Sequence, residues 1–298
     1  MFSKIIGRFL SKREKFDKAL SVSQGFLNAF ILETRIKNLV SPFSMGAGKS
    51  LRSIIYFNSV DWNDKRQYSE SIYKTAALIE TVHFASILHD DVIDNNLIRR
   101  NTDSSLKVHG RKKSILIGDY LLIKIVSEFF KIHKDQLIRN MFLRECSATA
   151  YGALLEQSLT IDSSVEEYIR VISLKTAPLF KISAFLGAYL ASNDFAKAKK
   201  NALFGVCFGI LYQIQNDLDC YKHETFHKSE DYLEDNVTFP IIILKKYFNY
   251  NVFKSKDKKE GKYKMVQNII KSFKFQTISK EILNKYQQCF NDPLHELR

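Results

Sequence analysis

The sequence predicts an all-α fold. The chain of 298 residues contains only 11 glycines and 4 prolines, fewer than the usual shares of about 7% and 5%. It shows neither a regular run of short alternating strands nor an alternation of strand and helix patterns. So few helix breakers over this length favour long helices around a shared core. We therefore expect one large helical domain over residues 1–298, with residues 1–13 as a flexible or peripheral basic segment.

Ten helices are expected from the spacing of apolar residues and breakers. Their ranges are 14–38, 51–59, 65–95, 112–133, 135–160, 164–192, 194–222, 237–248, 262–274 and 277–290. The third contains residues 72–93, which include no Gly or Pro and are apolar almost all round, as in a buried helix. The sixth begins with a capping box of Ser164 and Glu167. It also contains Pro178, which should kink the helix and free a backbone carbonyl.

The end of the third helix carries a dense charge cluster. Asp90 and Asp94 share a helix face, and Asp91 is turned from them by about 100°. Because a helix C-terminus disfavours negative charge, these acids repel one another unless a cation lies between them. Their oxygens suit Mg²⁺, with Mn²⁺ as the alternative, and Arg99 and Arg100 suit phosphate. The cluster therefore indicates a site for a metal-bound diphosphate, against the alternative of a solvated acidic helix end.

A Gly-rich turn precedes the second helix. Residues 46–52 read GAGKSLR. The P-loop pattern needs a glycine where Phe43 stands, and no strand precedes the turn. A helix that opens with Lys49 and Arg52 is nevertheless a good diphosphate cradle, because backbone N–H groups and two cations converge there. The alternative is an ordinary turn with surface basic residues.

Three other polar positions interrupt apolar helices. His83 lies two turns before Asp90 on the same face, where a satisfied core histidine competes with a ligand role. A zinc site from Glu80, His83 and His89 lacks any further supporting residue. Lys175 and Thr176, beside the expected kink, can reach into a cavity.

A second polar patch lies near the end of the seventh helix. Gln213, Asn216, Asp217 and Cys220 fall at i, i+3, i+4 and i+7, on one face. Facing the first patch across a bundle, it would complete a metal–diphosphate site.

Taken together, these motifs resemble the trans-type polyprenyl diphosphate synthase family over roughly residues 40–240. In chain order they are GAGKSLR at 46–52, DDVIDNNLIRR at 90–100, Gly118-Asp119-Tyr120-Leu121-Leu122, Lys175-Thr176, YQIQNDLDC at 212–220 and NVTFP at 236–240. Each motif alone is weak, but their order and spacing together are specific.

The resemblance implies a large all-α bundle of the isoprenoid synthase type around a deep apolar cavity, in a homodimer. It also implies a head-to-tail (1'-4) condensation of isopentenyl diphosphate onto an allylic diphosphate, giving a trans-polyprenyl diphosphate. In the reaction that the resemblance implies, the allylic diphosphate loses pyrophosphate and becomes an allylic cation. The resemblance assigns the site residues as follows: to Mg²⁺, Asp90, Asp91, Asp94, Asn216 and Asp217; to the allylic diphosphate, Arg99 and Lys175; to isopentenyl diphosphate, Lys49, Arg52, His83 and Arg100; and to the lining of the allylic cation, Thr176 and Gln213.

Product length is indicated by the residues before the first Asp. Ala85 and Ser86 are small, where aromatic residues would floor the pocket and stop growth early. Val82 and Leu78 lie deeper on that face, so we expect a medium- or long-chain product. The floor can also lie near residues 121–126 or across the dimer interface.

Departures from the family pattern leave two alternatives open. Asn216 and Cys220 replace acids in the second motif. One alternative is a regulatory or weakly active subunit of a heteromeric prenyl synthase. The other is a class I terpene cyclase, because Asn216, Asp217, Cys220 and Glu224 resemble its metal motif. Against the cyclase stand the basic residues assigned to isopentenyl diphosphate.

The charge and the cysteines suggest partners and compartment. A net charge of +13 suits phosphorylated substrates, and no nucleic-acid partner is expected. The basic, amphipathic N-terminus can touch a membrane or act as an organelle-targeting segment. Four widely spaced cysteines without a CxxC pattern indicate free thiols and a reducing compartment. No apolar run reaches the length of a membrane span, and we expect a cytoplasmic protein, or an organellar one if the N-terminus is a targeting sequence.

Overall fold

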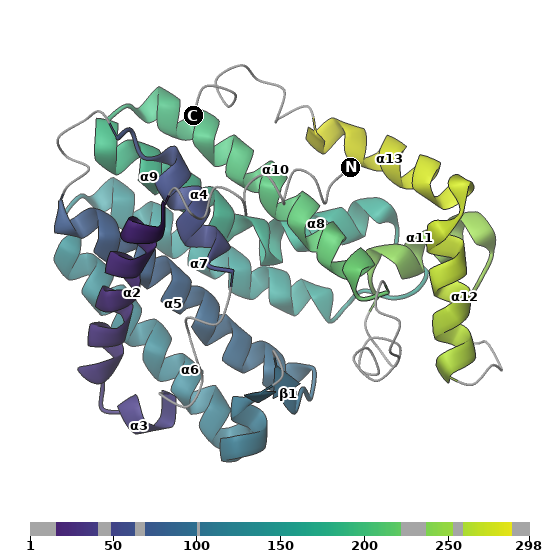
Figure 1. The fold of residues 1–298 in the computed structure, drawn as a ribbon, viewed down its shortest axis with the longest axis horizontal. Coiled ribbons are helices and arrows are strands. Elements are labelled where there is room, and N and C mark those ends of the chain that lie inside the picture. The colour runs from purple at the N-terminus through teal and green to yellow at the C-terminus, as the bar shows by residue number, and fades with distance from the viewer. Residues whose placement is uncertain are drawn as a thin grey trace. The chain divides into compact units, whose positions relative to one another are not determined.

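The computed structural model describes residues 16–40, 49–62, 69–99, 102–221, 237–252 and 259–287 (Figure 1). These residues form helices and one hairpin, whose two strands have two residues each, so the all-α prediction is confirmed. The elements are α2 (Asp17–Leu32), α3 (Lys37–Val40), α4 (Leu51–Ser59), α5 (Glu70–Ile93), β1 (Ile98–Arg99), β2 (Thr102–Asp103), α6 (Ser105–Ile132), α7 (Gln136–Glu156), α8 (Val165–Lys175), α9 (Ala177–Ser192), α10 (Phe195–Asp219), α11 (Phe239–Phe248), α12 (Lys259–Lys271) and α13 (Phe273–Gln287).

The chain divides into two compact units, each drawn from non-consecutive segments. We call the unit that contains residues 4–147 and 179–205 the α5 unit, and the one that contains residues 148–178 and from 206 onward the α11 unit. The single-domain organisation expected from the sequence stays a prediction.

The α5 unit is organised by its longest apolar helices. α5 packs along α6, and α2 and α4 both pack on α5. Val82 and Ala85 of α5 are buried, as the all-round apolar pattern predicts. Phe129 of α6 stacks on Phe142 of α7 with ring centroids 3.8 Å apart, which joins the next helix to this core.

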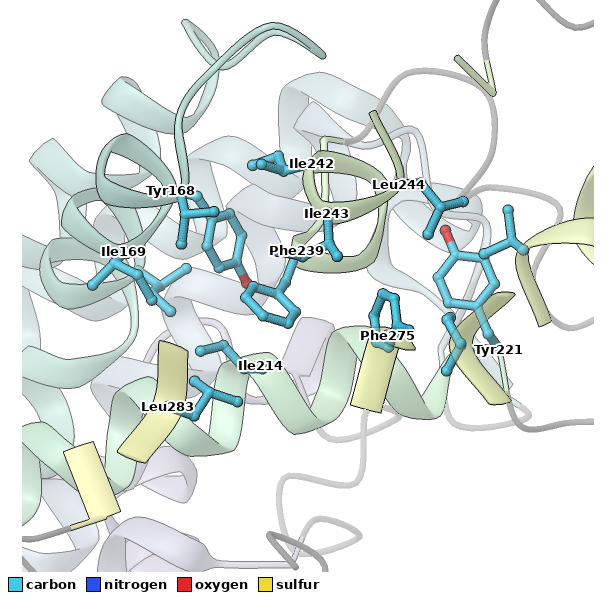
Figure 2. Close-up of a cluster of buried hydrophobic side chains, with 14 of the residues drawn as sticks. Tyr168, Ile169, Ile214, Tyr221, Phe239, Ile242, Ile243, Leu244, Phe275 and Leu283 are labelled. Atoms are coloured by element: carbon cyan, nitrogen blue, oxygen red, sulfur yellow. The ribbon is translucent and has the colours of Figure 1, made fainter. Parts of the chain in front are cut away.

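The α11 unit has its own apolar core (Figure 2). Its residues come from several helices, among them Tyr168 from α8, Ile214 from α10, Phe239 from α11, Val266 from α12 and Phe275 from α13. Tyr168 brings a hydroxyl into this apolar environment, and a buried hydroxyl needs a hydrogen-bond partner. The partner of this hydroxyl is Asp217 of α10.

Most expected helices are present, with informative differences at their ends. The range 51–59 is α4, and the capping box of Ser164 and Glu167 is formed. The helix expected over 112–133 is the part of α6 that follows Gly110, whose non-helical conformation (φ +76°) separates it from a short first stretch that begins at Ser105. The range 164–192 is two helices, which separate at Thr176.

The expectation of free thiols is wrong for Cys207, which is disulfide-bonded. Wide spacing in the sequence does not keep cysteines apart in a fold, so spacing alone could not exclude this bond. Cys146 and Cys220 are free thiols. Within the described ranges no single helix is long and apolar enough to cross a membrane, and one bent pair, α8 with α9, meets that criterion by length and composition only.

Candidate functional site

The first aspartate motif forms the last turn of α5. The Asp94 N–H donates to the Asp90 carbonyl (2.8 Å), and Asn95 then takes a left-handed conformation (φ +55°) that ends the helix. The β1–β2 hairpin follows, with Ile98 paired to Asp103. This turn returns Arg99 to the helix end, where its Nε donates to Asp91 Oδ1 at 2.5 Å.

The three aspartates are therefore not equivalent. Asp91 is 2% exposed. Burial raises the pKa of this carboxyl, while the charge and hydrogen bond of Arg99 oppose the rise. Asp90 and Asp94 are only partly buried and lie four residues apart on one helix face. Asp91 thus holds the arginine, and the other two carboxylates remain the better candidates for a cation.

The donor chemistry at this helix end suits a hard divalent cation. Among the described side chains, no three of His, Cys, Asp or Glu converge to hold a metal ion by themselves. Mg²⁺ commonly takes one or two protein carboxylates and fills its remaining positions with water and substrate phosphate oxygens. Asp90 and Asp94 supply that number of carboxylates, so the residues fit a metal that is completed by a diphosphate.

Glu80, His83 and His89 do not come together to form the zinc site considered as an alternative. Glu80 accepts a hydrogen bond from the Ser53 N–H (2.9 Å). His89 lies beside Asp119, with Nε2 3.1 Å from Oδ1. His83 is half-buried on α5, and its carbonyl accepts from Ser86.

The basic residues of the Gly-rich turn lie at the start of α4. Residues 46–48 and Arg100 are outside the described residues, while Lys49 is exposed. Ser50 is left-handed (φ +48°) and gives no side-chain cap, so Glu80 caps the helix through Ser53. Arg52 is buried, with its guanidinium carbon 4.7 Å from the centre of the Phe180 ring. An arginine held inside the protein disfavours the alternative of an ordinary turn with surface basic residues.

The second motif belongs to the α11 unit. Lys175, at the end of α8, forms an ion pair with Glu156 of α7. Gly152 lies beside this pair, because a Cβ there would be 2.1 Å from the Lys175 backbone nitrogen. Thr176 donates its hydroxyl to Gln213 Oε1 at 3.0 Å, and Gln213 Nε2 donates to Asp217 Oδ1 at 2.9 Å.

Asp217 is the end of this hydrogen-bond chain. Its Oδ2 accepts from the Tyr168 hydroxyl at 2.5 Å and from the Phe239 N–H at 2.9 Å. Burial raises the pKa of Asp217, while these hydrogen bonds and the charge of Lys175 oppose the rise. Asn216 is partly exposed, and its carbonyl accepts from Cys220 Sγ. The ligand roles of Asn216 and Asp217 stay predictions.

Sequence reasoning missed Tyr168 and Glu156. Tyr168 lies in an ordinary amphipathic helix, where an aromatic residue is usually core. Glu156 lies 19 residues before Lys175, and no signal in the sequence pairs the two.

The residues assigned to product length lie in α5, where Ser86 is only partly buried. Ala85 and Val82 are almost fully enclosed, and the Ser86 hydroxyl donates to the His83 carbonyl. Further toward the start of α5 the α5 unit contains a cavity of about 270 Å³. Its apolar lining includes Phe26, Phe30, Ala77, Leu78 and Ile132. Leu78, which we expected deep in the product pocket, therefore lines this cavity.

Comparisons with known proteins agree with the motifs. The family model of polyprenyl synthetases matches residues 33–272. The chain is 32% identical to geranylfarnesyl diphosphate synthase of Methanosarcina mazei over 72% of each protein. It is 28% identical to octaprenyl diphosphate synthase of Escherichia coli over 77% of this chain and 74% of the relative.

Solved structures support the same fold. A polyprenyl synthase from Caulobacter crescentus, in complex with calcium and isoprenyl diphosphate, matches with a TM-score of 0.79 at 20% identity, over 95% of this chain and 89% of that one. Heptaprenyl diphosphate synthase from Staphylococcus aureus matches with a TM-score of 0.79 at 24% identity, over 93% and 91%. The predictions of fold and enzyme class are thus confirmed: the chain belongs to the polyprenyl synthetase family and is a transferase that extends prenyl diphosphates.

Proposed function

We propose that this enzyme adds isopentenyl diphosphate head-to-tail (1'-4) to an allylic diphosphate, with loss of pyrophosphate from the allylic substrate and of a proton from the isopentenyl unit at each addition, and releases a medium- or long-chain trans-polyprenyl diphosphate. The observation that carries the proposal is the end of α5. Asp90 and Asp94 share a face there, while the hairpin returns Arg99 to Asp91. Acidic ligands for a cation and a base for phosphate lie within one short segment.

In the proposed reaction, Asp90 and Asp94 hold Mg²⁺, with Mn²⁺ as a substitute. A cation held by these two carboxylates would supply positive charge for the leaving pyrophosphate. Arg99 binds the allylic diphosphate, and Asp91 fixes the arginine. The family relationship and the calcium and isoprenyl diphosphate in the Caulobacter enzyme support this part of the proposal.

Two further groups of residues complete the proposed machinery. Lys49, Arg52, His83 and Arg100 bind isopentenyl diphosphate. Lys175 binds the allylic diphosphate after it leaves Glu156, its partner in the absence of substrate. Thr176 and Gln213 place polar oxygens near the allylic cation, since both are held in one hydrogen-bond chain. An apolar surrounding keeps water from that cation.

We propose that Ala85, Ser86 and Val82 leave room for a product beyond fifteen carbons. Their small or slender side chains, and the cavity lined by Leu78 farther along the same helix, support this length class. Relatives at similar identity include geranylfarnesyl and octaprenyl synthases, which bracket a wide range of lengths.

We propose a homodimer that docks through α6. Leu116 and Ile123 are seven residues apart on this helix and are 65% and 71% exposed. Ile115 and, on α7, Leu143 are also exposed. Exposed aliphatic residues that recur along a helix mark a protein-contact surface. We further propose a cytoplasmic enzyme with no nucleic-acid partner, whose N-terminal segment, outside the described residues, touches the membrane surface peripherally.

The proposal is tested by incubating the pure protein with farnesyl diphosphate, labelled isopentenyl diphosphate and Mg²⁺. Asp90→Asn and Asp94→Asn should each reduce incorporation by about 100-fold or more, because a charge-stabilising group is lost. Asp103→Asn is the matched control. Its exposed carboxylate, at the end of β2, pairs with Lys107 of α6, and this variant should keep wild-type activity.

The alternatives give different results in the same assay. A terpene cyclase would convert the allylic substrate to hydrocarbon without isopentenyl diphosphate. A regulatory subunit would show no incorporation until a partner subunit is added. Equal activity of wild type and Asp90→Asn would contradict the proposed synthase.

A further inference from the structure

Asp217 is a buried carboxylate whose oxygens are already used by the protein. It is 2% exposed and accepts three hydrogen bonds, from the Tyr168 hydroxyl, the Phe239 N–H and the Gln213 amide. These donors come from α8, from the start of α11 and from one turn earlier in α10. A metal ligand at this position would have to exchange these donors for a cation. The satisfied set indicates another role.

The hydrogen bonds give the neighbouring polar groups a fixed direction. Gln213 turns its NH₂ group toward Asp217, whose Oδ1 accepts the hydrogen bond. Its carbonyl oxygen then faces Thr176, whose hydroxyl must donate to it. The orientation of two residues proposed to face the allylic cation is thus set by a third, buried residue.

Asp217 also caps α11 from another helix. Thr238, the N-cap residue, makes no side-chain capping bond. The Phe239 N–H, one of the free donors of the first turn, is satisfied by Asp217 instead, and Pro240 has no N–H. Figure 2 shows the Tyr168 hydroxyl beside the Phe239 ring, and the two ring centroids are 6.0 Å apart.

We propose that Asp217 is a positioning residue rather than a metal ligand, and that Tyr168 is its essential partner. The pair orients Gln213 and Thr176 and fixes the start of α11. The inference rests on the proposed function for its catalytic consequence. It gives Tyr168 a role in the site, and it excludes Asp217 from the residues that bind Mg²⁺.

The test compares Tyr168→Phe, Asp217→Asn and the double variant with wild type. Both single variants should reduce kcat by about 10- to 100-fold, the usual loss when a partner that orients a ligand or catalytic group is removed. Because the pair acts as a unit, the double variant should be no slower than the slower single variant. KM for isopentenyl diphosphate and the Mg²⁺ concentration at half-maximal rate should stay within twofold of wild type. A loss of folded protein would also lower the apparent kcat at unchanged KM, so kcat is calculated per folded molecule, with the folded fraction of each variant measured by circular dichroism.

Two readouts do not depend on turnover. One is the binding of farnesyl thiodiphosphate, an analogue that resists ionisation, over a series of Mg²⁺ concentrations. The other is hydrogen exchange at the Phe239 amide, which should become at least tenfold faster in Asp217→Asn. Tyr151→Phe, at an exposed tyrosine of α7, is the matched control and should match wild type in all measurements.

Opposite results would overturn the inference. If Asp217→Asn raises the Mg²⁺ requirement for analogue binding tenfold while Tyr168→Phe leaves it unchanged, Asp217 is a metal ligand. Unchanged exchange at Phe239 in Asp217→Asn would also overturn the capping role. The Asp90→Asn variant tests the proposed function independently of the inference about Asp217. It should raise the Mg²⁺ requirement, and if it does not, the assignment of the first motif is wrong whatever Asp217 does. A wild-type protein that binds no analogue overturns both.

Discussion

Replacing Gly152 with alanine tests how closely α7 must approach the end of α8. A Cβ at this position would lie 2.1 Å from the Lys175 nitrogen and 2.3 Å from the Leu174 carbonyl carbon. Both are backbone atoms, so no side-chain rotation relieves the overlap. The backbone must move by about 1.3 Å to reach the 3.4 Å of an ordinary contact. That movement displaces Lys175 from its ion pair with Glu156.

The expected cost follows from two opposing effects. Overpacking of a close contact costs about 1–3 kcal/mol, and alanine regains about 1 kcal/mol of helix propensity. Since the colliding atoms are backbone, we expect the upper end of the range, a net loss of about 2 kcal/mol for Gly152→Ala. Gly25→Ala in α2 is the matched control, because nothing lies within 4 Å of its added Cβ. It should gain about 1 kcal/mol.

Thermal unfolding and steady-state kinetics measure both effects. At roughly 2 °C per kcal/mol for a chain of this size, Gly152→Ala should melt about 4 °C lower and Gly25→Ala about 2 °C higher. A displacement of about 1 Å in a substrate-binding group can cost about 100-fold, so kcat/KM for the allylic diphosphate should fall by that order in Gly152→Ala. If both variants gain stability and keep wild-type kinetics, the close crossing at Gly152 is refuted.

Three other predictions concern the α5 unit. Burial, with a smaller contribution from Arg139, lowers the pKa of His133 to about 4 from 6.5, so stability is present above pH 6.5 and is lost as the pH falls toward 4. The loss should be about 3 kcal/mol in denaturant titrations, and His133→Gln should lack it. Gly118→Ala should lower activity about tenfold, since its Cβ would be 2.4 Å from His89 Nε2, next to the first aspartate motif. Ile123→Glu should convert the proposed dimer to a folded monomer in analytical ultracentrifugation, because this side chain is already exposed.

Each of these predictions has a result that contradicts it. A His133→Gln protein with the same acid-induced loss as wild type would show that other groups carry that loss. Full activity of Gly118→Ala would mean that His89 can move without effect on Asp90. An unchanged sedimentation coefficient for Ile123→Glu would exclude this face of α6 from the dimer contact.

The helices could be predicted where the signal is local. α4 matched its expected range, because a Gly-rich turn precedes it and its apolar residues are dense. The long part of α6 follows Gly110 and matched the expected range, while the short stretch from Ser105 was not predicted, because Gly110, at φ +76°, breaks the helical period between the two. The division of 164–192 into two helices was foreseen only as a kink at Pro178. The sequence does not reveal that the break falls at Thr176.

In the candidate site, too, the contacts within one short segment could be predicted and the contacts between distant segments could not. The first aspartate motif is contiguous, so its helix face follows from residue spacing alone. The bond from Arg99 to Asp91 depends on a hairpin that periodicity does not reveal. Gln213 and Asp217 are four residues apart and were placed on one face. Tyr168, 49 residues earlier in the chain, could not be connected to Asp217, because that contact is made only by the packing of α8 on α10 and α11.

The most direct test of the proposed synthase is the size of its product. Purified protein is incubated with farnesyl diphosphate, labelled isopentenyl diphosphate and Mg²⁺, and the dephosphorylated products are separated by chain length. The proposed reaction and the small residues at Ala85 and Ser86 predict a ladder that ends in one dominant product longer than fifteen carbons. No incorporation, with Asp90→Asn indistinguishable from wild type, would contradict the account.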